Sequence, residues 1–469
     1  MPFNSMAFVY FLLFFGFLYL LVPRRFTSLL FLAASYLFYG WWEWRFLGLL
    51  LFTTIAAYLF AIGISVSGRT ATGRTLLTVS LATNLAVLGI FKYANFFALS
   101  LASALSACGL HVSIPTLNLL LPVGISFYTF QTMAYTIDVW RGTIPPERNL
   151  LNFAAFVSFF PLLLAGPIER GSHLLPQLKL TPRPQREDFR SAVWLMVFGY
   201  FLKVFLADNL ALVVDQIYLN LNQASGLDLV VCHYAYAFQI YGDFAGYSFI
   251  ALGVARLFAI KLNENFHFPY FISTPRNFWR HWHITLSLWL RDYLYIPLGG
   301  NRGSRPAMYR SLMLTMLLGG LWHGAAWHFV LWGGYQGFLL ILHRMFSIKT
   351  PAQPPSILKR LSTWFLMFNL TCFGWLLFRV PDLQTLLIIF RRSIAAPFSV
   401  SDRTLYWSGL SAFYIVFPLA ILLVQWRKSA PTRMPFESDI LKAITYFIML
   451  FLLLALGSWG TRTFIYFGF

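Results

Sequence analysis

Apolar runs long enough to cross a bilayer recur along the whole of this chain. The first covers residues 6–22, and one of the last covers residues 440–458. Only 11% of the 469 residues are charged, whereas soluble domains carry roughly 25%. Because the hydrocarbon core of a bilayer offers no hydrogen-bond partners, a chain that crosses it must form helices or a closed barrel. The runs are continuous and do not alternate, which argues against a barrel.

We therefore predict an all-α integral membrane protein, a polytopic bundle of about 11–13 transmembrane or re-entrant helices. No polar stretch is large enough for a separate soluble domain, so residues 1–469 are predicted to form a single membrane-embedded domain. Nearly all intramembrane polar residues fall between about residues 117 and 345, which we take as the catalytic core. Groups of plain apolar helices flank this core, and one predicted span within it covers residues 310–343.

The formal charge of +19 follows the membrane topology. Basic residues stand in pairs between apolar spans, as in Arg24-Arg25 and Arg391-Arg392. This distribution is typical of the positive-inside rule, so we expect the lipid bilayer as a partner and no nucleic acid. Arg24 and Arg25 follow the first span directly, which predicts that the N-terminus lies outside the cytoplasm.

The most informative single residue is His323, in a stretch from 311 to 342 that carries no formal charge. A buried imidazole without a hydrogen bond costs roughly 1–3 kcal/mol. Ionisable groups at this depth are uncommon and often functional, so the position predicts a site. A packing histidine held by a backbone carbonyl is the alternative, and this residue alone does not decide between them.

A second cluster combines charged groups with aromatic ones. The titratable residues between positions 276 and 292 are Arg276, Arg280, His281, His283, Arg291 and Asp292. On a continuous helix, Trp279, Trp282 and Trp289 would share one broad face. An interfacial belt explains these aromatics, but it explains the crowded charges less well. A cationic cluster beside an aqueous cavity suits an anionic cofactor that bears phosphates.

Asp243 is the only formal charge between residues 229 and 255. A carboxylate isolated in this way needs a partner, and we favour a structural role in which an Arg or a Tyr joins it to another helix. The sequence contains no motif for other kinds of catalytic chemistry. We find no Walker loop, no dinucleotide fingerprint, no nucleophile elbow and no metal-ligand spacing, so we expect no metal.

Residues 278–287, 291–302 and 318–324 carry a resemblance that extends over essentially the whole chain. In these strings the chain resembles the membrane-bound O-acyltransferase (MBOAT) family, and most closely its bacterial alginate O-acetyltransferase branch. The resemblance implies a bundle of helices around a central funnel. The chain departs from the family pattern near Asp243. Gly242, Ala245 and Phe249 stand at positions where that pattern has other residues, and at the position of Phe249 the pattern has an acid.

The resemblance implies that His323 is the family's essential histidine and that His283 matches the second one. Arg280, Arg291 and Asn301 fall in shared strings, and we predict that they bind the donor. Asp243, Asp292 and Trp322 are predicted to form the polar core.

The function implied is transfer of an acetyl group from a cytoplasmic donor, acetyl-CoA, across the membrane. The acceptor would be a secreted exopolysaccharide such as alginate or cellulose, reached through periplasmic or membrane-associated partner proteins. His323 would act as general base, which contributes about 10²–10⁴ in rate. His283 would orient the thioester or donate to its oxyanion, and a covalent acyl-histidine is an open alternative.

The expected location is the bacterial inner membrane, with multiple passes and a periplasmic N-terminus. Two alternatives stay open from the sequence. One is transfer of D-alanyl or another acyl group to a cell-envelope polymer. The other belongs to a different class, a polysaccharide or small-molecule transporter, which would also place polar residues in the membrane.

Overall fold

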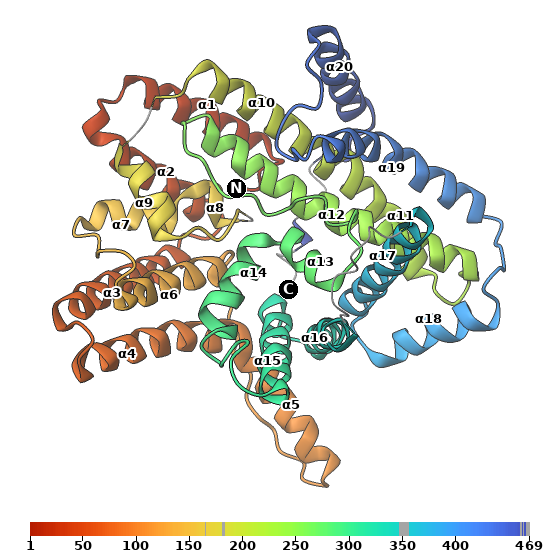
Figure 1. Cartoon of the computed structure of the whole chain (residues 1–469), viewed down its shortest axis with the longest axis horizontal. Coiled ribbons are helices and arrows are strands. Elements are labelled where there is room, and N and C mark those ends of the chain that lie inside the picture. Colours follow the sequence, from red (N-terminus) through yellow and green to blue (C-terminus); the bar gives the residue numbers. More distant parts are fainter. Residues whose placement is uncertain (165, 181–182, 347–355, 460–461, 463, 466–469) are drawn as a thin grey trace. The chain divides into compact units, whose positions relative to one another are not determined.

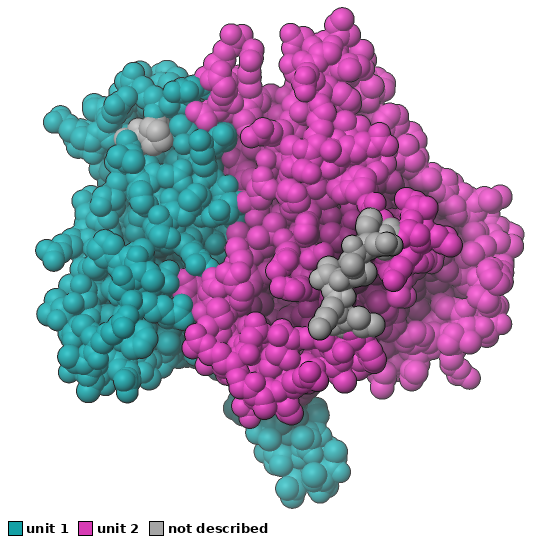
Figure 2. Space-filling view, viewed as in Figure 1, with its two compact units in different colours: residues 1–185, 255–263 teal, residues 186–254, 264–469 magenta. Residues whose placement is uncertain are grey.

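The computed structural model describes residues 1–469 except 165, 181–182, 347–355, 460–461, 463 and 466–469. Within the described part every regular element is a helix and none is a strand, as the composition predicts (Figure 1). The chain folds into two compact units (Figure 2). Unit 1 comprises residues 1–185 and 255–263, and unit 2 comprises residues 186–254 and 264–469. The prediction of a single domain with its core at 117–345 stays a prediction.

The helices of unit 1 are α1 (Met6–Leu21), α2 (Thr27–Gly40), α3 (Phe46–Ser67), α4 (Ala71–Leu88), α5 (Ala94–Ala107), α6 (Ile125–Arg141), α7 (Leu150–Ser158), α8 (Phe160–Leu163) and α9 (Gly171–Leu180). Phenylalanine rings fill its core. Phe15 contacts Phe31, Phe160 and Phe258, with ring centroids 4.8–5.4 Å apart. These rings join the N-terminal helices to the short segment that returns at residues 255–263.

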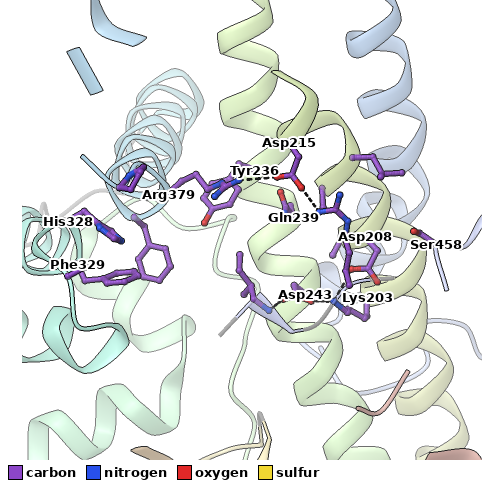
Figure 3. Close-up of a pocket in the computed structure, with 18 of the residues that line it drawn as sticks. Lys203, Asp208, Asp215, Tyr236, Gln239, Asp243, His328, Phe329, Arg379 and Ser458 are labelled. Atoms are coloured by element: carbon purple, nitrogen blue, oxygen red, sulfur yellow. Dashed lines mark hydrogen bonds and ion pairs between the residues drawn. The ribbon is translucent and has the colours of Figure 1, made fainter. Parts of the chain in front are cut away.

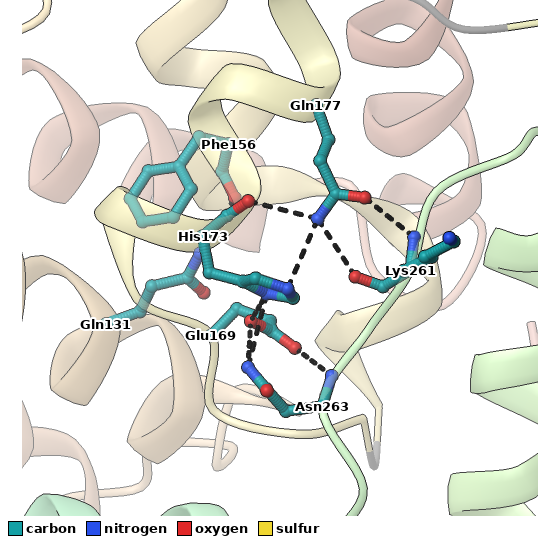
Figure 4. A network of polar contacts seen from close by, with 7 residues as sticks. All are labelled: Gln131, Phe156, Glu169, His173, Gln177, Lys261 and Asn263. Carbon is teal, nitrogen blue, oxygen red and sulfur yellow. Dashed lines mark hydrogen bonds and ion pairs between the residues drawn. The ribbon is translucent and has the colours of Figure 1, made fainter.

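A polar network fixes the same returning segment (Figure 4). The Glu169 carboxylate, 0% exposed, accepts hydrogen bonds from the backbone N–H of Asn263 at 2.6 Å and from its side-chain amide at 2.8 Å. Nδ1 of His173 lies 2.7 Å from Oε2 of this carboxylate. Gln177 bonds both backbone groups of Lys261. The buried charge is therefore satisfied by several donors, as a buried carboxylate requires.

The helices of unit 2 are α10 (Arg186–Tyr200), α11 (Asp208–Leu219), α12 (Gly226–Arg256), α13 (Pro275–His281), α14 (Ile284–Leu290), α15 (Arg305–His323), α16 (Trp327–Phe346), α17 (Ile357–Arg379), α18 (Leu383–Ala395), α19 (Thr404–Arg427) and α20 (Asp439–Leu456). A π-helical segment, Phe201–Ala207, joins α10 to α11, and another, Arg291–Tyr295, follows α14. Such π segments often occur at functional sites.

Glycines allow α12 to approach α10 and the π segment closely. A Cβ at Gly246 would meet the Gly199 carbonyl oxygen at 2.8 Å, and a Cβ at Gly242 would meet the Leu202 carbonyl oxygen at 2.8 Å. Gly242 is one of the positions where the sequence departs from the family pattern. Its missing side chain is what lets α12 lie against Leu202, and backbone approach through small residues is common between membrane helices.

Six helical stretches within the described ranges are long and apolar enough to cross a membrane. They are Phe46–Ser67, Ala71–Ala107, Arg186–Leu219, Ile357–Arg379, Thr404–Arg427 and Asp439–Leu456. The single span predicted at 310–343 is wrong, because α15 and α16 are separate helices joined at Gly324. A Cβ at Gly324 would lie 2.1 Å from the Phe329 ring, so glycine lets the turn close over that side chain.

Candidate active site

Trp322 and His323 end helix α15 in a buried aromatic environment. His323 is 3% exposed, and its ring centroid lies 5.1 Å from that of Trp322. Trp332 of α16 and Phe378 of α17 enclose the same imidazole, at 5.0 and 5.4 Å. Three helices therefore meet at this histidine, and the packing fixes the position of its ring.

His283 lies at the break between helices α13 and α14. Its backbone is left-handed, with φ 41° and ψ 56°, a conformation that is uncommon outside glycine. The next residue, Ile284, donates its N–H to the carbonyl of Asn265 at 2.9 Å, and this bond lies outside any helix. Strain of this kind concentrates at functional sites. Because the helix is broken here, the tryptophans do not share the face that a continuous helix would give them. Trp282 packs on Trp375, and Trp289 packs on Tyr293.

The side chain of His283 is 0% exposed and its Nδ1 lies 3.3 Å from Oδ1 of Asn265. The Asn265 amide also bonds the hydroxyl groups of Ser248 and Thr285, at 3.2 and 2.6 Å. His283 is therefore held in a buried polar network that joins it to the segment around Asn265.

Trp322 lies against both histidines. Its ring centroid is 5.9 Å from that of His283 and 5.1 Å from that of His323. The structure therefore brings together three residues that the sequence singled out separately. Phe244 closes the other side of His283, with ring centroids 4.7 Å apart.

A charged cavity of about 960 Å³ lies beside this group, within unit 2 (Figure 3). Phe378 and Phe329 belong to its wall, and Phe378 is also the ring that contacts His323. Ala325 and Ala326, from the turn after His323, line it as well. Phe378 thus belongs both to the surroundings of His323 and to the aromatic wall of the cavity.

Lys203 forms ion pairs with both buried carboxylates of the cavity. Its ammonium lies 2.8 Å from Oδ1 of Asp208 and 2.5 Å from Oδ1 of Asp243, and its side chain is 1% exposed. The second oxygen of Asp243 accepts the backbone N–H of Ile465 at 2.7 Å. The expected partner of Asp243 was an Arg or a Tyr, and the structure corrects this to a lysine.

A second charged group lies at the end of α17. Asp215 accepts from Arg379 at 3.0 Å and from Arg462 at 2.5 Å. The guanidinium carbon of Arg379 lies 5.0 Å from the centroid of the Tyr218 ring. All three charged side chains are partly exposed, at 34–36% for Asp215 and Arg379 and 27% for Arg462.

The remaining predicted site residues are Arg280, Arg291, Asn301, Asp243 and Asp292. Arg280 and Arg291 are exposed, and Arg291 pairs with the adjacent Asp292 at 2.6 Å. Asp292 therefore belongs to a local ion pair on the π segment, whereas Asp243 pairs with Lys203. Oδ1 of Asn301 accepts from Tyr295 and Arg344, just before α15 begins. Donor binding by Arg280, Arg291 and Asn301 stays a prediction.

Lys203, Asp208, Asp215, Arg379 and Arg462 were missed by the sequence analysis. Lys203 had a usable signal, because it is the only charged residue between 191 and 207. Asp208 and Arg379 stand at helix ends and Arg462 in the C-terminal segment, where charge is ordinary, and Asp215 lies inside α11. Among the described residues, no three His, Cys, Asp or Glu side chains gather as they would around a metal ion.

The chain matches the family model of MBOAT, the membrane-bound O-acyltransferase family, over residues 36–379. It is 42% identical over 403 residues to a protein of Azotobacter vinelandii named "Probable alginate O-acetylase AlgI", covering 86% of this chain and 78% of that protein. It is 35% identical over 422 residues to a peptidoglycan O-acetyltransferase of Helicobacter pylori, covering 83% and 79%. It is 26% identical over 284 residues to a teichoic acid D-alanyltransferase of Bacillus subtilis, covering 56% and 70%.

The chain therefore belongs to the membrane-bound O-acyltransferase family. It is a multi-pass membrane protein and an O-acyltransferase, and its relatives act as acyltransferases on polymers of the cell envelope. The prediction of the family from residues 278–287, 291–302 and 318–324 is confirmed.

Proposed function

We propose that this protein transfers an acetyl group from acetyl-CoA in the cytoplasm to a hydroxyl group of an acceptor on the other side of the membrane. The observation that carries the proposal is the position of the two histidines. His283 and His323 both pack on Trp322, and Phe378, which contacts His323, also lines a charged cavity.

We infer the orientation of the protein in the membrane from the hairpin that α15 and α16 form. Its turn, at Ala325 and Ala326, lines the cavity, whereas its open end carries Arg302, Arg305 and Arg344. By the positive-inside rule the open end is cytoplasmic and the cavity faces outward. The inner membrane and a periplasmic N-terminus fit the same rule.

The basic, cytoplasmic end of this hairpin suits an acyl donor that has an anionic head group and a long arm. Helix α15 has 19 residues, so about 28 Å separates its basic start from His323 at 1.5 Å per residue. A phosphate-bearing head such as that of CoA would bind near Arg291, Asn301 and the basic residues around them. Its arm would then carry the thioester toward the histidines.

The chemistry proposed is direct transfer. The acceptor oxygen attacks the thioester carbonyl while His323 takes its proton, which is general-base catalysis worth about 10²–10⁴ in rate. The carbon–sulfur bond then breaks, His323 returns the proton to the thiolate, and the products are an ester and free CoA. His283, held in place by Asn265, orients the thioester. A covalent acyl-histidine is the alternative path.

For the acceptor we propose a secreted exopolysaccharide such as alginate or cellulose, reached through periplasmic partner proteins. The support is the relative named for alginate O-acetylation, at 42% identity over 86% of the chain. The D-alanyltransferase relative, at 26% over 56%, makes D-alanyl transfer the second candidate.

The test uses the purified protein in sealed vesicles with acetyl-CoA on the basic side. Wild type should release CoA only when an acceptor is present, and His323→Gln should release none. A transporter would move solute without consuming acetyl-CoA. CoA release by His323→Gln at the wild-type rate would refute the assignment of His323 as base.

A further inference from the structure

An apolar groove of about 950 Å³ lies between α16 and α17, within unit 2. Apart from a histidine and an aspartate, every residue that lines it is apolar, aromatic or glycine. The hydroxyl group of Tyr335 is used elsewhere, because it donates to the carbonyl oxygen of Leu370 at 2.8 Å. Leu331 and Phe338 line the groove and are each 52% exposed. On a membrane protein, an open apolar surface of this kind has to be covered by something apolar.

The length of the groove matches one leaflet of a bilayer. Helix α16 has 20 residues, so it is about 30 Å long, which equals the thickness of the hydrocarbon core. Along this helix the lining of the groove runs only from Trp327 to Phe338, which is about 16 Å at 1.5 Å per residue. Trp327 is 64% exposed, and exposed tryptophans are typical of the membrane–water interface. The groove thus begins at an interface and extends to about the middle of the membrane.

We propose that the groove binds one acyl chain of a phospholipid from the leaflet that adjoins the charged cavity. An acyl chain is apolar, and it reaches from an interface to the bilayer midplane, as the groove does. A transmembrane helix of a partner protein would cross the whole hydrocarbon core and would need a groove about twice as long. The ligand is distinct from the acyl donor and the acyl acceptor, so the inference goes beyond the proposed function and does not depend on it.

The interfacial end of the groove offers a polar contact for the head region of the lipid. His328 lines both the groove and the charged cavity shown in Figure 3. Its Nδ1 is buried and has no hydrogen-bond partner among the described residues. The carboxylate of Asp382, in contrast, is occupied, because its two oxygens accept from the backbone N–H and the hydroxyl group of Thr385. An imidazole nitrogen can donate or accept, so we expect an ester or hydroxyl group of the lipid to bond to His328.

Gly334 keeps the middle of the groove open. It lines the groove between the interfacial end and the deep end, and a Cβ at this position would meet Leu317 at 3.4 Å, which is ordinary van der Waals contact. A side chain can therefore be added there without a clash with the backbone, but a long one would take space from the acyl chain. If the side chain of Gly334→Leu displaces about two methylene groups of the bound lipid, the affinity should fall by about 10- to 20-fold.

The experiment is photolabelling of the purified full chain in nanodiscs made of equal parts of phosphatidylethanolamine and phosphatidylglycerol. Two phosphatidylglycerol probes each carry a photoreactive diazirine on one acyl chain. In one probe the diazirine is next to the glycerol ester, and in the other it is at the far end of the chain. Labelled positions are mapped by mass spectrometry of peptides. The first probe should label residues 327–331, and the second should label residues 334–338 and 373–377, with yields that saturate as the fraction of probe rises.

Two variants and two controls test the site. Gly334→Leu should lower labelling by the second probe by about 10- to 20-fold at a limiting probe fraction. Leu331→Trp adds bulk at an exposed position of the groove and should act in the same direction. Gly16→Leu is the matched control, because a Cβ at Gly16 has no atom within 4 Å and this residue lies outside the groove, so labelling should not change. His323→Gln should be labelled as wild type is, since the site does not require acyl transfer.

Three results would overturn the proposal. The first is labelling spread over all apolar helices in proportion to their exposure, without saturation in the groove. The second is labelling of Gly334→Leu and Leu331→Trp at the wild-type yield. The third is protection of the groove in native membranes by a co-purifying protein or by a second copy of this chain, because the groove would then be a protein interface.

Discussion

Replacing Lys203 by methionine tests how the buried charges of unit 2 are held. The ammonium is 2.8 Å from Asp208 and 2.5 Å from Asp243, and these two carboxylates are 3% and 5% exposed. Removing one partner of a buried pair costs about 3–5 kcal/mol because the other charge is left uncompensated. Here two acids lose their common cation, so we expect a cost of about 4 kcal/mol or more.

Thermal unfolding in detergent, followed by tryptophan fluorescence, measures this cost. A loss of 1 kcal/mol lowers the Tm of a domain of 150–250 residues by about 2–4 °C, so Lys203→Met should unfold about 10 °C below wild type. Adding Asp208→Asn and Asp243→Asn should recover a large part of the loss, since neutral amides replace the stranded charges. Lys359→Met, at an exposed position, is the control and should change little. A Tm of Lys203→Met equal to that of the control would refute the reasoning.

Two further predictions concern the packing at the active site and the polar network of unit 1. Gly324→Ala would place a Cβ 2.1 Å from the Phe329 ring and should cost about 1–3 kcal/mol of stability together with acyl transfer, whereas Gly16→Ala, with no atom within 4 Å, should change neither. Normal transfer by Gly324→Ala would show that this turn tolerates a side chain. The hydrogen bond to Glu169 raises the pKa of His173, so protonated His173 stabilises the fold fully below its unfolded pKa, about 6.5, and this stabilisation is lost as the pH rises through the folded pKa. The Tm of wild type should therefore fall more between about pH 6 and pH 8 than that of His173→Gln, and equal slopes would contradict this.

Much of the helical pattern follows from local sequence. The apolar runs at 6–22 and 440–458 predict α1 and α20 to within a few residues, because in lipid a continuous apolar run has few alternatives to a helix. The breaks are harder to predict. The turn after α15 needs glycine at 324 because Phe329 occupies the space of a Cβ there, and the break at His283 is accompanied by the bond from Ile284 to Asn265. Both features involve tertiary contacts that no local pattern carries.

The candidate site, too, is predictable in part from local sequence and depends in part on tertiary contacts. His283 and His323 are visible in the sequence as titratable groups among apolar ones, and both fall in the strings shared with the family. That Trp322 packs between them depends on how α14 and α15 meet. The cavity is less predictable, because Asp215, Arg379 and Arg462 come from segments up to 247 residues apart and each is unremarkable in its own stretch.

The most direct test of the central claim is polymer-bound acetate in a strain that lacks this protein. The strain is complemented with wild type or with His323→Ala at matched membrane levels. Acetate on the polymer with wild type alone is the predicted result, and it would establish acyl transfer that depends on His323. Equal acetate with His323→Ala would contradict the account and return this histidine to a packing role.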